Sequence, residues 1–320
     1  MRQKAFFMCS NGLGDKFLDV IGVHVLCHYL DYNPKIQFNK SHIEHFDWGT
    51  NHYDLRLFAP MAAFSDIDDC QYTITAPNAS SSLSPYKTWK FLCDQGIPVS
   101  FMELNEKYRE LAKNLIRPSP PIEERLPVVL ENAYGIHLRK SDKIKSHGCD
   151  IRHENRADEF GIITENLIAD IGRFVEQDPH ATFLVVSEDK AWKKTIEEYI
   201  DGIDGIDGMG RQTDKHERCI VLDYSNPQGY VNFESVLDMF ALSRCKTILQ
   251  GVKYSSYSIL AALIGQGKLV NYSPALESNA ECLIYTWNSA VEINGEYIEN
   301  PEILSYMTKA VQDFSICPIK

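Results

Sequence analysis

The chain has 320 residues, of which 44% are hydrophobic and 24% charged, which is enough for two domains that each bury a core. Its formal net charge of -12 argues against nucleic acid or an anionic membrane as the main partner, because a binder of phosphate backbones needs a broad basic face. Nine cysteines without a C-x-x-C pair are typical of reduced thiols rather than of a disulfide framework.

The N-terminal part predicts a strand followed by a helix. Residues 5–10 are a short apolar strand, residues 11–15 are a glycine-containing turn, and residues 16–30 have the apolar periodicity of a helix. Further strands are predicted at residues 35–39 and 54–59. Charged residues interrupt the first thirty positions, and no later run is apolar enough to span a membrane.

A proline-rich segment predicts the boundary between two domains. Residues 103–116 contain strong helix formers, and the prolines of residues 117–121 cannot continue a helix. We therefore predict an N-terminal domain at residues 1–128 and a C-terminal domain at residues 129–320.

The C-terminal part alternates strands with helices, which predicts a parallel sheet covered on both faces and hence an α/β fold. The predicted strands are residues 134–138, 182–187 and 220–222, the predicted helices are residues 162–176 and 192–200, and residues 233–262 read as helix, strand, loop and helix. Ligands of such sheets bind beyond the carboxyl ends of the strands.

A cluster of cations follows the first strand of the predicted C-terminal sheet. Arg139 offers a planar fork for phosphate oxygens, whereas Lys140 and Lys143 act as mobile point charges. A pyrophosphate is the natural guest of such a cluster. The competing interpretation is a solvated run of charges that pair with one another on the surface.

A second phosphate-binding element is predicted in the segment 233–262. Ser255 or Ser256 can cap the last helix there, which leaves the first N–H groups and the positive end of the helix dipole facing the preceding loop. Asp238 lies on the preceding helix and either points toward a ligand edge or is a surface aspartate.

Other candidate sites are weaker. The turn with Gly12 and Gly14 lacks the third glycine of a dinucleotide fingerprint and the lysine of a P-loop, and the role expected of it is close approach of its backbone to a ligand. Asp66 and Asp68 imitate a metal-binding carboxylate pair, but in an acidic chain we interpret them as a solvated turn. No metal cofactor is predicted.

Four blocks of the sequence together resemble the fucosyltransferase-like superfamily of GT-B glycosyltransferases, especially the alpha-1,6-fucosyltransferases of the bacterial nodulation-factor and animal N-glycan type. The blocks are residues 11–15, 137–143, 183–189 and 237–245 followed by 254–256. The resemblance implies two Rossmann-like domains facing one another across a cleft, with the helix predicted near residues 301–314 crossing back to the first domain.

The resemblance also implies roles for individual residues in holding the donor. Arg139 would hold the β-phosphate of a GDP-sugar, His137 and Asp238 would lie near the guanine, and Ser255 or Ser256 would add a phosphate contact. The remaining expected donor contacts come from the glycine turn and from the end of another strand, namely Gly12, Gly14, Glu188 and Asp189.

The implied reaction is the inverting, metal-independent transfer of L-fucose from GDP-fucose to a glycan acceptor, with Arg139 and Lys143 neutralising the leaving diphosphate. The chain departs from the family at the catalytic base, because His147 stands where the animal enzymes place a glutamate. The candidates for the base are His147, Asp150, Glu154 and Asp15, and the sequence does not choose among them.

Three other expectations accompany this prediction. The donor could instead be a UDP-pentose or another GDP-deoxyhexose, and the missing glutamate makes a non-catalytic nucleotide-sugar or glycan-binding protein conceivable. Animal relatives in the secretory pathway carry a membrane anchor that this chain lacks, so a cytoplasmic protein from a bacterial or viral setting is expected.

Overall fold

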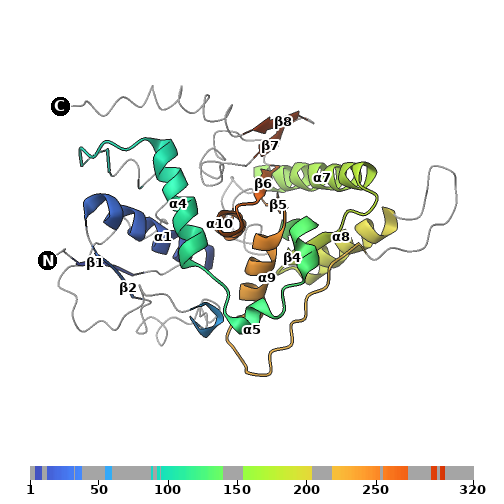
Figure 1. Ribbon diagram of the computed structural model, residues 1–320. Coiled ribbons are helices and arrows are strands. Elements are labelled where there is room, and N and C mark those ends of the chain that lie inside the picture. The colour runs from blue at the N-terminus through green and yellow to red at the C-terminus, as the bar shows by residue number, and fades with distance from the viewer. Residues whose placement is uncertain are drawn as a thin grey trace.

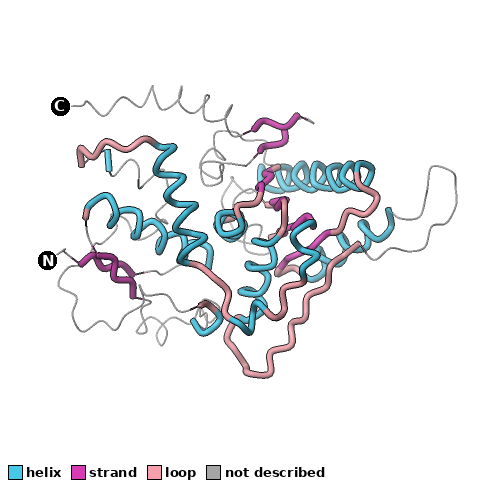
Figure 2. Tube along the Cα trace, viewed as in Figure 1, coloured by secondary structure: helices cyan, strands magenta, loops and turns pink. Residues whose placement is uncertain are grey.

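The structure is a computed structural model, and the residues it describes fall into several ranges. These are residues 4–8, 13–31, 33–37, 55–59, 88, 92–93, 95–139, 154–203, 218–252, 255–272, 290–293 and 296–299. Figure 1 labels the helices and strands, and Figure 2 colours the same view by secondary structure.

The N-terminal half opens with a strand, a helix and a second strand that form one βαβ unit. Strand β1 (Lys4–Met8) pairs in parallel with β2 (Asn33–Gln37), and α1 (Leu13–Leu30) connects them. The predicted strand and helix are confirmed. The helix begins at Leu13, so residues 13–15 of the expected turn are helical, and residues 11–12 lie outside the described residues.

The strand predicted at residues 54–59 is wrong. The structure has a short 3-10 helix, η1 (Leu55–Leu57), and an isolated antiparallel bridge between Phe58 and Pro118. Leu57 and Phe58 are adjacent and both buried, an arrangement that a strand with one face on the core does not allow, because its side chains alternate between opposite faces.

The helix predicted at residues 103–116 is confirmed as α4 (Phe101–Leu115). Its start is fixed by Ser100, whose hydroxyl accepts a hydrogen bond from the backbone N–H of Glu103 at 3.1 Å. Two short elements follow before the sheet, α5 (Pro120–Glu123) and η2 (Val128–Asn132).

A six-stranded sheet organises the C-terminal half. Its order is β4-β3-β5-β6-β7-β8, and neighbouring strands are parallel except for the antiparallel pair β7 and β8. The strands are β3 (Tyr134–Leu138), β4 (Phe183–Ser187), β5 (Thr247–Gly251), β6 (Lys268–Asn271), β7 (Ala290–Ile293) and β8 (Glu296–Glu299). The last three strands were not predicted, but the predicted α/β class with a parallel sheet is confirmed.

Four helices cover the two faces of this sheet. They are α7 (Glu154–Gln177), α8 (Lys190–Gly202), α9 (Phe233–Arg244) and α10 (Ser256–Gly265). The strand predicted at residues 220–222 is wrong, since the only pairing there is a parallel bridge between Cys219 and Phe183. The helix expected at residues 301–314 lies outside the described residues.

Side chains of successive strand residues alternate between two apolar clusters, one on each face. In β4, Leu184 and Val186 pack with α9 and α10, whereas Phe183 and Val185 pack with α7 and α8. Both faces are therefore buried, which explains why the strands are almost continuously apolar rather than alternating with polar residues.

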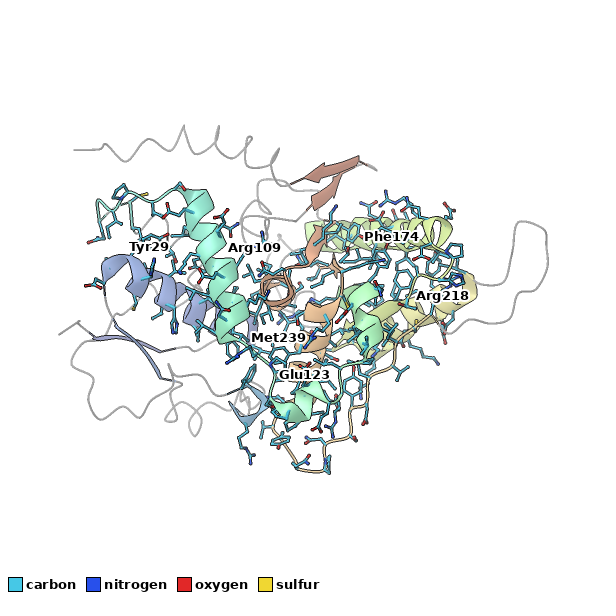
Figure 3. The ribbon with its side chains drawn as sticks, viewed as in Figure 1. Tyr29, Arg109, Glu123, Phe174, Arg218 and Met239 are labelled. Atoms are coloured by element: carbon cyan, nitrogen blue, oxygen red, sulfur yellow. The ribbon has the colours of Figure 1, made fainter. Side chains whose placement is uncertain are left out.

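The helices α1 and α4 pack directly on α10 and extend the first of these clusters (Figures 1 and 3). Arg109 of α4 donates from Nε to the side-chain oxygen of Gln266 at 2.9 Å, and Gln266 donates back to the carbonyl of Arg109 at 3.2 Å. The predicted boundary between residues 128 and 129 falls at the start of η2 and stays a prediction. Within the described residues, no helix is long and apolar enough to cross a membrane.

Replacing Gly265 by alanine tests the close contact between α9 and α10. A Cβ atom at this position would lie 1.7 Å from the carbonyl oxygen of Ser243, so Gly265→Ala must push the two helices apart. We expect a loss of about 1–3 kcal/mol in the free energy of unfolding, measured by chemical denaturation.

The matched control is Gly202→Ala at the end of α8, where a Cβ would meet no atom within 4 Å. This variant is expected to be neutral or slightly more stable. Equal destabilisation by both substitutions would contradict the packing described.

Candidate functional site

The candidate site lies where the order of the strands reverses. The chain passes from β3 to β4 on one side and then returns to β5 on the other side of β3, so the carboxyl ends of β3 and β5 flank a topological switch point. Open α/β sheets bind their ligands in the crevice at such a point. Leu138 and Gly251 are paired at this edge, and Arg139 and the segment leading to α10 follow directly.

Arg139 is the first residue after β3. Its side chain is 33% exposed, and its Nε lies 3.8 Å from Oε1 of Glu188, the residue that follows β4. A pair at this distance and exposure is weak, because water screens it. The guanidinium therefore lies at the carboxyl edge of the sheet, beside the end of β4.

The start of α10 carries an unusual serine. Ser255 occupies the N-cap position and is buried, with 1% of its surface exposed, but its hydroxyl makes no capping hydrogen bond. Its Oγ has no hydrogen-bond partner among the described residues. A buried hydroxyl without a partner is rare in folded proteins, and a ligand atom is one physical reason for it.

The start of α1 lies against the start of α10. A Cβ atom on Gly14 would be 2.4 Å from the carbonyl carbon of Ser256 and 2.5 Å from the backbone nitrogen of Tyr257, so only glycine permits this approach. The first turns of two helices thus meet, and each helix start presents N–H groups and the positive end of a dipole.

His137 is buried in β3 on the side that faces α10. Its Nδ1 lies 3.3 Å from Oγ of Ser258, and its ring centroid lies 5.0 Å from that of Tyr257. Burial, reinforced by the positive charge of Arg139, lowers its pKa to about 3. The imidazole is therefore neutral at physiological pH.

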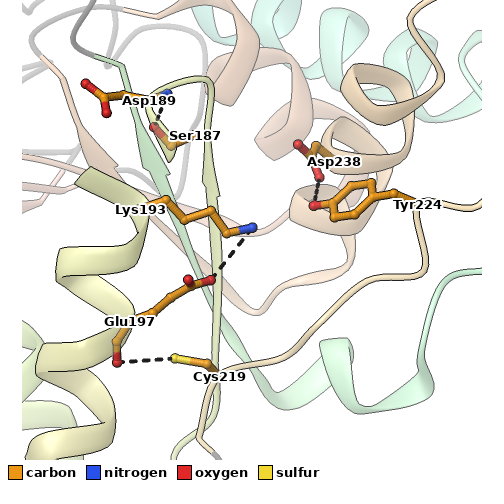
Figure 4. A network of polar contacts seen from close by, with 7 residues as sticks. All are labelled: Ser187, Asp189, Lys193, Glu197, Cys219, Tyr224 and Asp238. Atoms are coloured by element: carbon orange, nitrogen blue, oxygen red, sulfur yellow. Dashed lines mark hydrogen bonds and ion pairs between the residues drawn. The ribbon is translucent and has the colours of Figure 1, made fainter. Parts of the chain in front are cut away.

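Asp189 is the N-cap residue of α8. Its Oδ1 accepts hydrogen bonds from the backbone N–H groups of Ala191 and Trp192 at 3.1 and 3.0 Å, and so caps α8. Its own backbone N–H donates to the hydroxyl of Ser187 at 3.0 Å (Figure 4). A contact of Asp189 with the donor stays a prediction.

Asp238 belongs to a separate polar group on α9. Its carboxylate accepts a hydrogen bond from the hydroxyl of Tyr224 at 2.7 Å (Figure 4). The positive charge of Lys193 on α8 also acts on this carboxylate. Burial raises the pKa of Asp238 to about 6, although the hydrogen bond from Tyr224 and the charge of Lys193 oppose the shift. Within the described residues, Asp238 is hydrogen-bonded to Tyr224 and not to His137 or Arg139.

The structure thus brings six of the predicted residues to the switch point. These are Gly14, His137, Arg139, Glu188, Ser255 and Ser256. Gly12, Lys143 and His147 lie outside the described residues, and Asp15 lies in α1 but its side chain is not described. The choice of catalytic base therefore stays open. Among the described residues, no group of three or more His, Cys, Asp or Glu side chains is placed to hold a metal ion.

Sequence reasoning missed Gln250, Ser258 and Tyr224. Gln250 was detectable, because it is a polar residue inside the otherwise apolar strand β5 and is fully buried. Ser258 follows Ser255 by three residues on an apolar helix, a weaker signal. Tyr224 lies in a segment without regular structure, and no pattern in the sequence indicates its contact with Asp238.

Comparison with known proteins finds likeness in fold. The chain is similar to NodZ alpha-1,6-fucosyltransferase soaked with GDP-fucose, with 12% identity, a TM-score of 0.49, and coverage of 82% of this chain and 93% of that one. It is also similar to a variant of Arabidopsis thaliana FUT1 in complex with GDP, with 10% identity, a TM-score of 0.48, and coverage of 86% and 71%.

A third similar structure is UDP-GlcNAc 2-epimerase from Neisseria meningitidis bound to UDP-GlcNAc, with 11% identity, a TM-score of 0.36, and coverage of 98% and 92%. No family model and no curated protein match the chain. NodZ is a fucosyltransferase of the kind that the four sequence blocks resemble. At identities of 10–12% these likenesses concern the fold, and the chemistry of this chain must be argued from its own residues.

The raised pKa of Asp238 predicts that its partly buried charge lowers stability at neutral pH. A carboxyl group whose folded pKa exceeds its unfolded value costs nothing below the unfolded pKa and its full amount above the folded pKa of about 6. We expect Asp238→Asn to raise the free energy of unfolding by about 1–3 kcal/mol at pH 8, and the gain to vanish near pH 4.

The control for this prediction is Asp223→Asn, because Asp223 is an exposed carboxylate whose pKa is lowered by hydrogen bonds from Ser225. Chemical denaturation at both pH values should show no gain for this variant. Loss of stability in Asp238→Asn at pH 8 would instead mean that the carboxylate is a net stabilising group.

Proposed function

We propose that this chain is a glycosyltransferase that transfers a sugar, L-fucose from GDP-fucose, to a glycan acceptor with inversion and without a metal. One observation carries the proposal. At the switch point of the parallel sheet, Arg139 follows the end of β3, and the first turns of α1 and α10 meet beside the buried hydroxyl of Ser255, which has no hydrogen-bond partner among the described residues.

These groups suit a diphosphate because they are all donors. A guanidinium pairs with two phosphate oxygens at once, and helix starts offer backbone N–H groups together with a favourable dipole. Ser255 adds a hydroxyl that has already lost its contact with water, so a hydrogen bond to a phosphate oxygen would satisfy it at little further cost.

The same groups support chemistry without a metal. When the glycosidic bond of a nucleotide sugar breaks, negative charge develops on the departing diphosphate, and fixed donors that face this charge lower the barrier. Arg139 and the two helix starts are fixed by the fold, because β3 and the Gly14 contact hold them. Lys143 is the predicted second cation.

The nucleoside end of the donor is supported by His137 and Asp238. Asp238 is a partly buried carboxylate whose pKa is raised by desolvation, and such perturbed groups are frequent at binding sites. The carboxylate would suit the adjacent N–H donors of a guanine edge. The choice of GDP over UDP in this proposal rests on the motif resemblance, and the guanine-edge chemistry of Asp238 supports it.

The acceptor half of the reaction needs a group that takes the proton of the acceptor hydroxyl. His147, Asp150, Glu154 and Asp15 remain the candidates. Release of GDP from GDP-fucose in the presence of a broad glycan panel tests turnover directly. Tight binding of GDP-fucose without release of GDP, with any acceptor, would favour a non-catalytic nucleotide-sugar-binding protein.

Arg139→Ala tests the diphosphate site. Loss of one charge-assisted contact to phosphate should weaken GDP binding by about tenfold to a hundredfold in isothermal titration calorimetry, while the thermal unfolding profile stays that of a folded chain. Unchanged affinity would reject the assignment.

Arg244→Ala is the matched control for this measurement. Arg244 is also a partly exposed arginine paired with one glutamate, Glu123, but it lies in the last turn of α9, away from the carboxyl ends of the strands. Its replacement should leave GDP affinity unchanged. Repeating the titrations with UDP separates a guanine site from a uracil site.

Ser255→Ala separates ligand binding from helix capping. Because Oγ of Ser255 makes no hydrogen bond in the described chain, its removal should leave the free energy of unfolding unchanged or slightly higher, whereas GDP affinity should fall by about threefold to tenfold. A loss of about 1 kcal/mol in stability with unchanged affinity would identify the serine as an ordinary helix cap.

A further inference from the structure

Three buried polar side chains form a chain of hydrogen bonds behind the proposed site. His137 of β3, Gln250 of β5 and Ser258 of α10 have 6%, 0% and 0% of their surfaces exposed. Oγ of Ser258 lies 3.3 Å from Nδ1 of His137 and 2.7 Å from Oε1 of Gln250, and Nε2 of Gln250 lies 3.1 Å from the carbonyl oxygen of Val252.

The direction of each hydrogen bond follows from the last group in the series, the carbonyl of Val252. The carbonyl of Val252 can only accept, so the amide NH₂ of Gln250 faces it and the amide oxygen of Gln250 faces Ser258. That oxygen is also only an acceptor, so Ser258 donates its single proton there. The other close neighbour of Ser258, the carbonyl of Ser255 at 3.3 Å, likewise only accepts.

His137 is therefore the donor to Ser258. With its only hydrogen directed at an acceptor, Oγ of Ser258 can do nothing but accept from Nδ1 of His137, which must carry a proton. The ring is neutral, because burial and the nearby charge of Arg139 lower its pKa to about 3. A neutral imidazole with a proton on Nδ1 has a bare lone pair on Nε2.

We propose that Gln250 and Ser258 are positioning residues that lock His137 in the Nδ1–H tautomer, so that its Nε2 accepts a hydrogen bond from an N–H or O–H group of the bound nucleoside diphosphate. This inference rests on the proposed function. Arg139 directly follows β3, two residues after His137, so the proposed diphosphate contact lies beside His137 and the donor group belongs to the nucleoside next to the diphosphate.

The tautomer can be tested without any nucleotide. In the chain labelled with ¹⁵N-histidine, the signal of His137, assigned by its loss in His137→Gln, should show a protonated Nδ1 and an unprotonated Nε2 throughout pH 5–8. In Ser258→Ala the fixed tautomer should be lost. A proton on Nε2 in the unaltered chain, or titration of His137 near pH 6.5, would overturn the proposal.

The effect on binding is measured by titrating GDP into the same variants. Ser258→Ala should weaken GDP binding by about threefold to tenfold, because His137 then presents the wrong nitrogen for part of the time. Ser243→Ala removes a buried serine hydroxyl of α9 that donates to the carbonyl of Phe240, and it should leave affinity unchanged. Equal effects of the two variants would reduce Ser258 to a packing role and overturn the proposal.

Two analogues test the ribose 2′-hydroxyl and the exocyclic amine as the donor on the ligand. 2′-Deoxy-GDP lacks the ribose 2′-hydroxyl and inosine diphosphate lacks the exocyclic amine, so the analogue without the relevant donor should bind with the same affinity to the unaltered chain and to His137→Gln. GDP itself should bind more weakly to His137→Gln. If the unaltered chain fails to bind GDP, the proposed function is rejected, whereas the ¹⁵N spectrum still decides the tautomer.

Discussion

The contact between the start of α1 and the start of α10 is the constraint on which the arrangement of the site depends. It is a contact of backbone with backbone, because a methyl group on Gly14 would overlap the peptide that joins Ser256 to Tyr257. Such close approach fixes the relative position of two helix starts far more rigidly than contact between flexible side chains. Donors contributed by distant parts of the sequence thereby converge on one small volume.

Several polar groups of the site lie in surroundings that make them unfavourable for stability. Asp238, His137 and the hydroxyl of Ser255 are polar groups in largely buried surroundings, where each is less stable than an apolar side chain of similar size would be. They lie near the ends of strands or on the helices that cover the sheet, whereas its centre is apolar on both faces. The apolar packing of the sheet stabilises the fold, whereas the polar groups near the strand ends lower its stability.

The sequence predicted most of this scaffold, since periodic apolar residues determine which segments are strands and which are helices. Residues 134–138 and the helix after Ser255 are clear examples, and the cationic residue at the strand end was correctly placed at the edge of the sheet. The segment around Leu57 was misassigned because adjacent buried residues resemble a fully buried strand. The antiparallel pair β7 and β8 was missed although Asn294 and Gly295, the two residues between them, are a strong sequence signal for a hairpin.

Contacts between distant residues were beyond the sequence. The pairing of Arg139 with Glu188, of Asp238 with Tyr224, and of His137 with Ser258 depends on the order of strands in the sheet, which periodicity does not encode. The orphaned hydroxyl of Ser255 was anticipated only as a helix cap, and its lack of a partner emerges only when the surrounding atoms are placed.

The apolar cluster shared by α1, α4, α9 and α10 has a practical consequence for dissecting the molecule. A fragment that begins near residue 129 would keep the whole sheet but would expose to water the surface of α10 on which α1 and α4 pack. Such a bare surface favours self-association. The C-terminal half of the chain is therefore expected to be obtained in soluble form only when α1 and α4 accompany it.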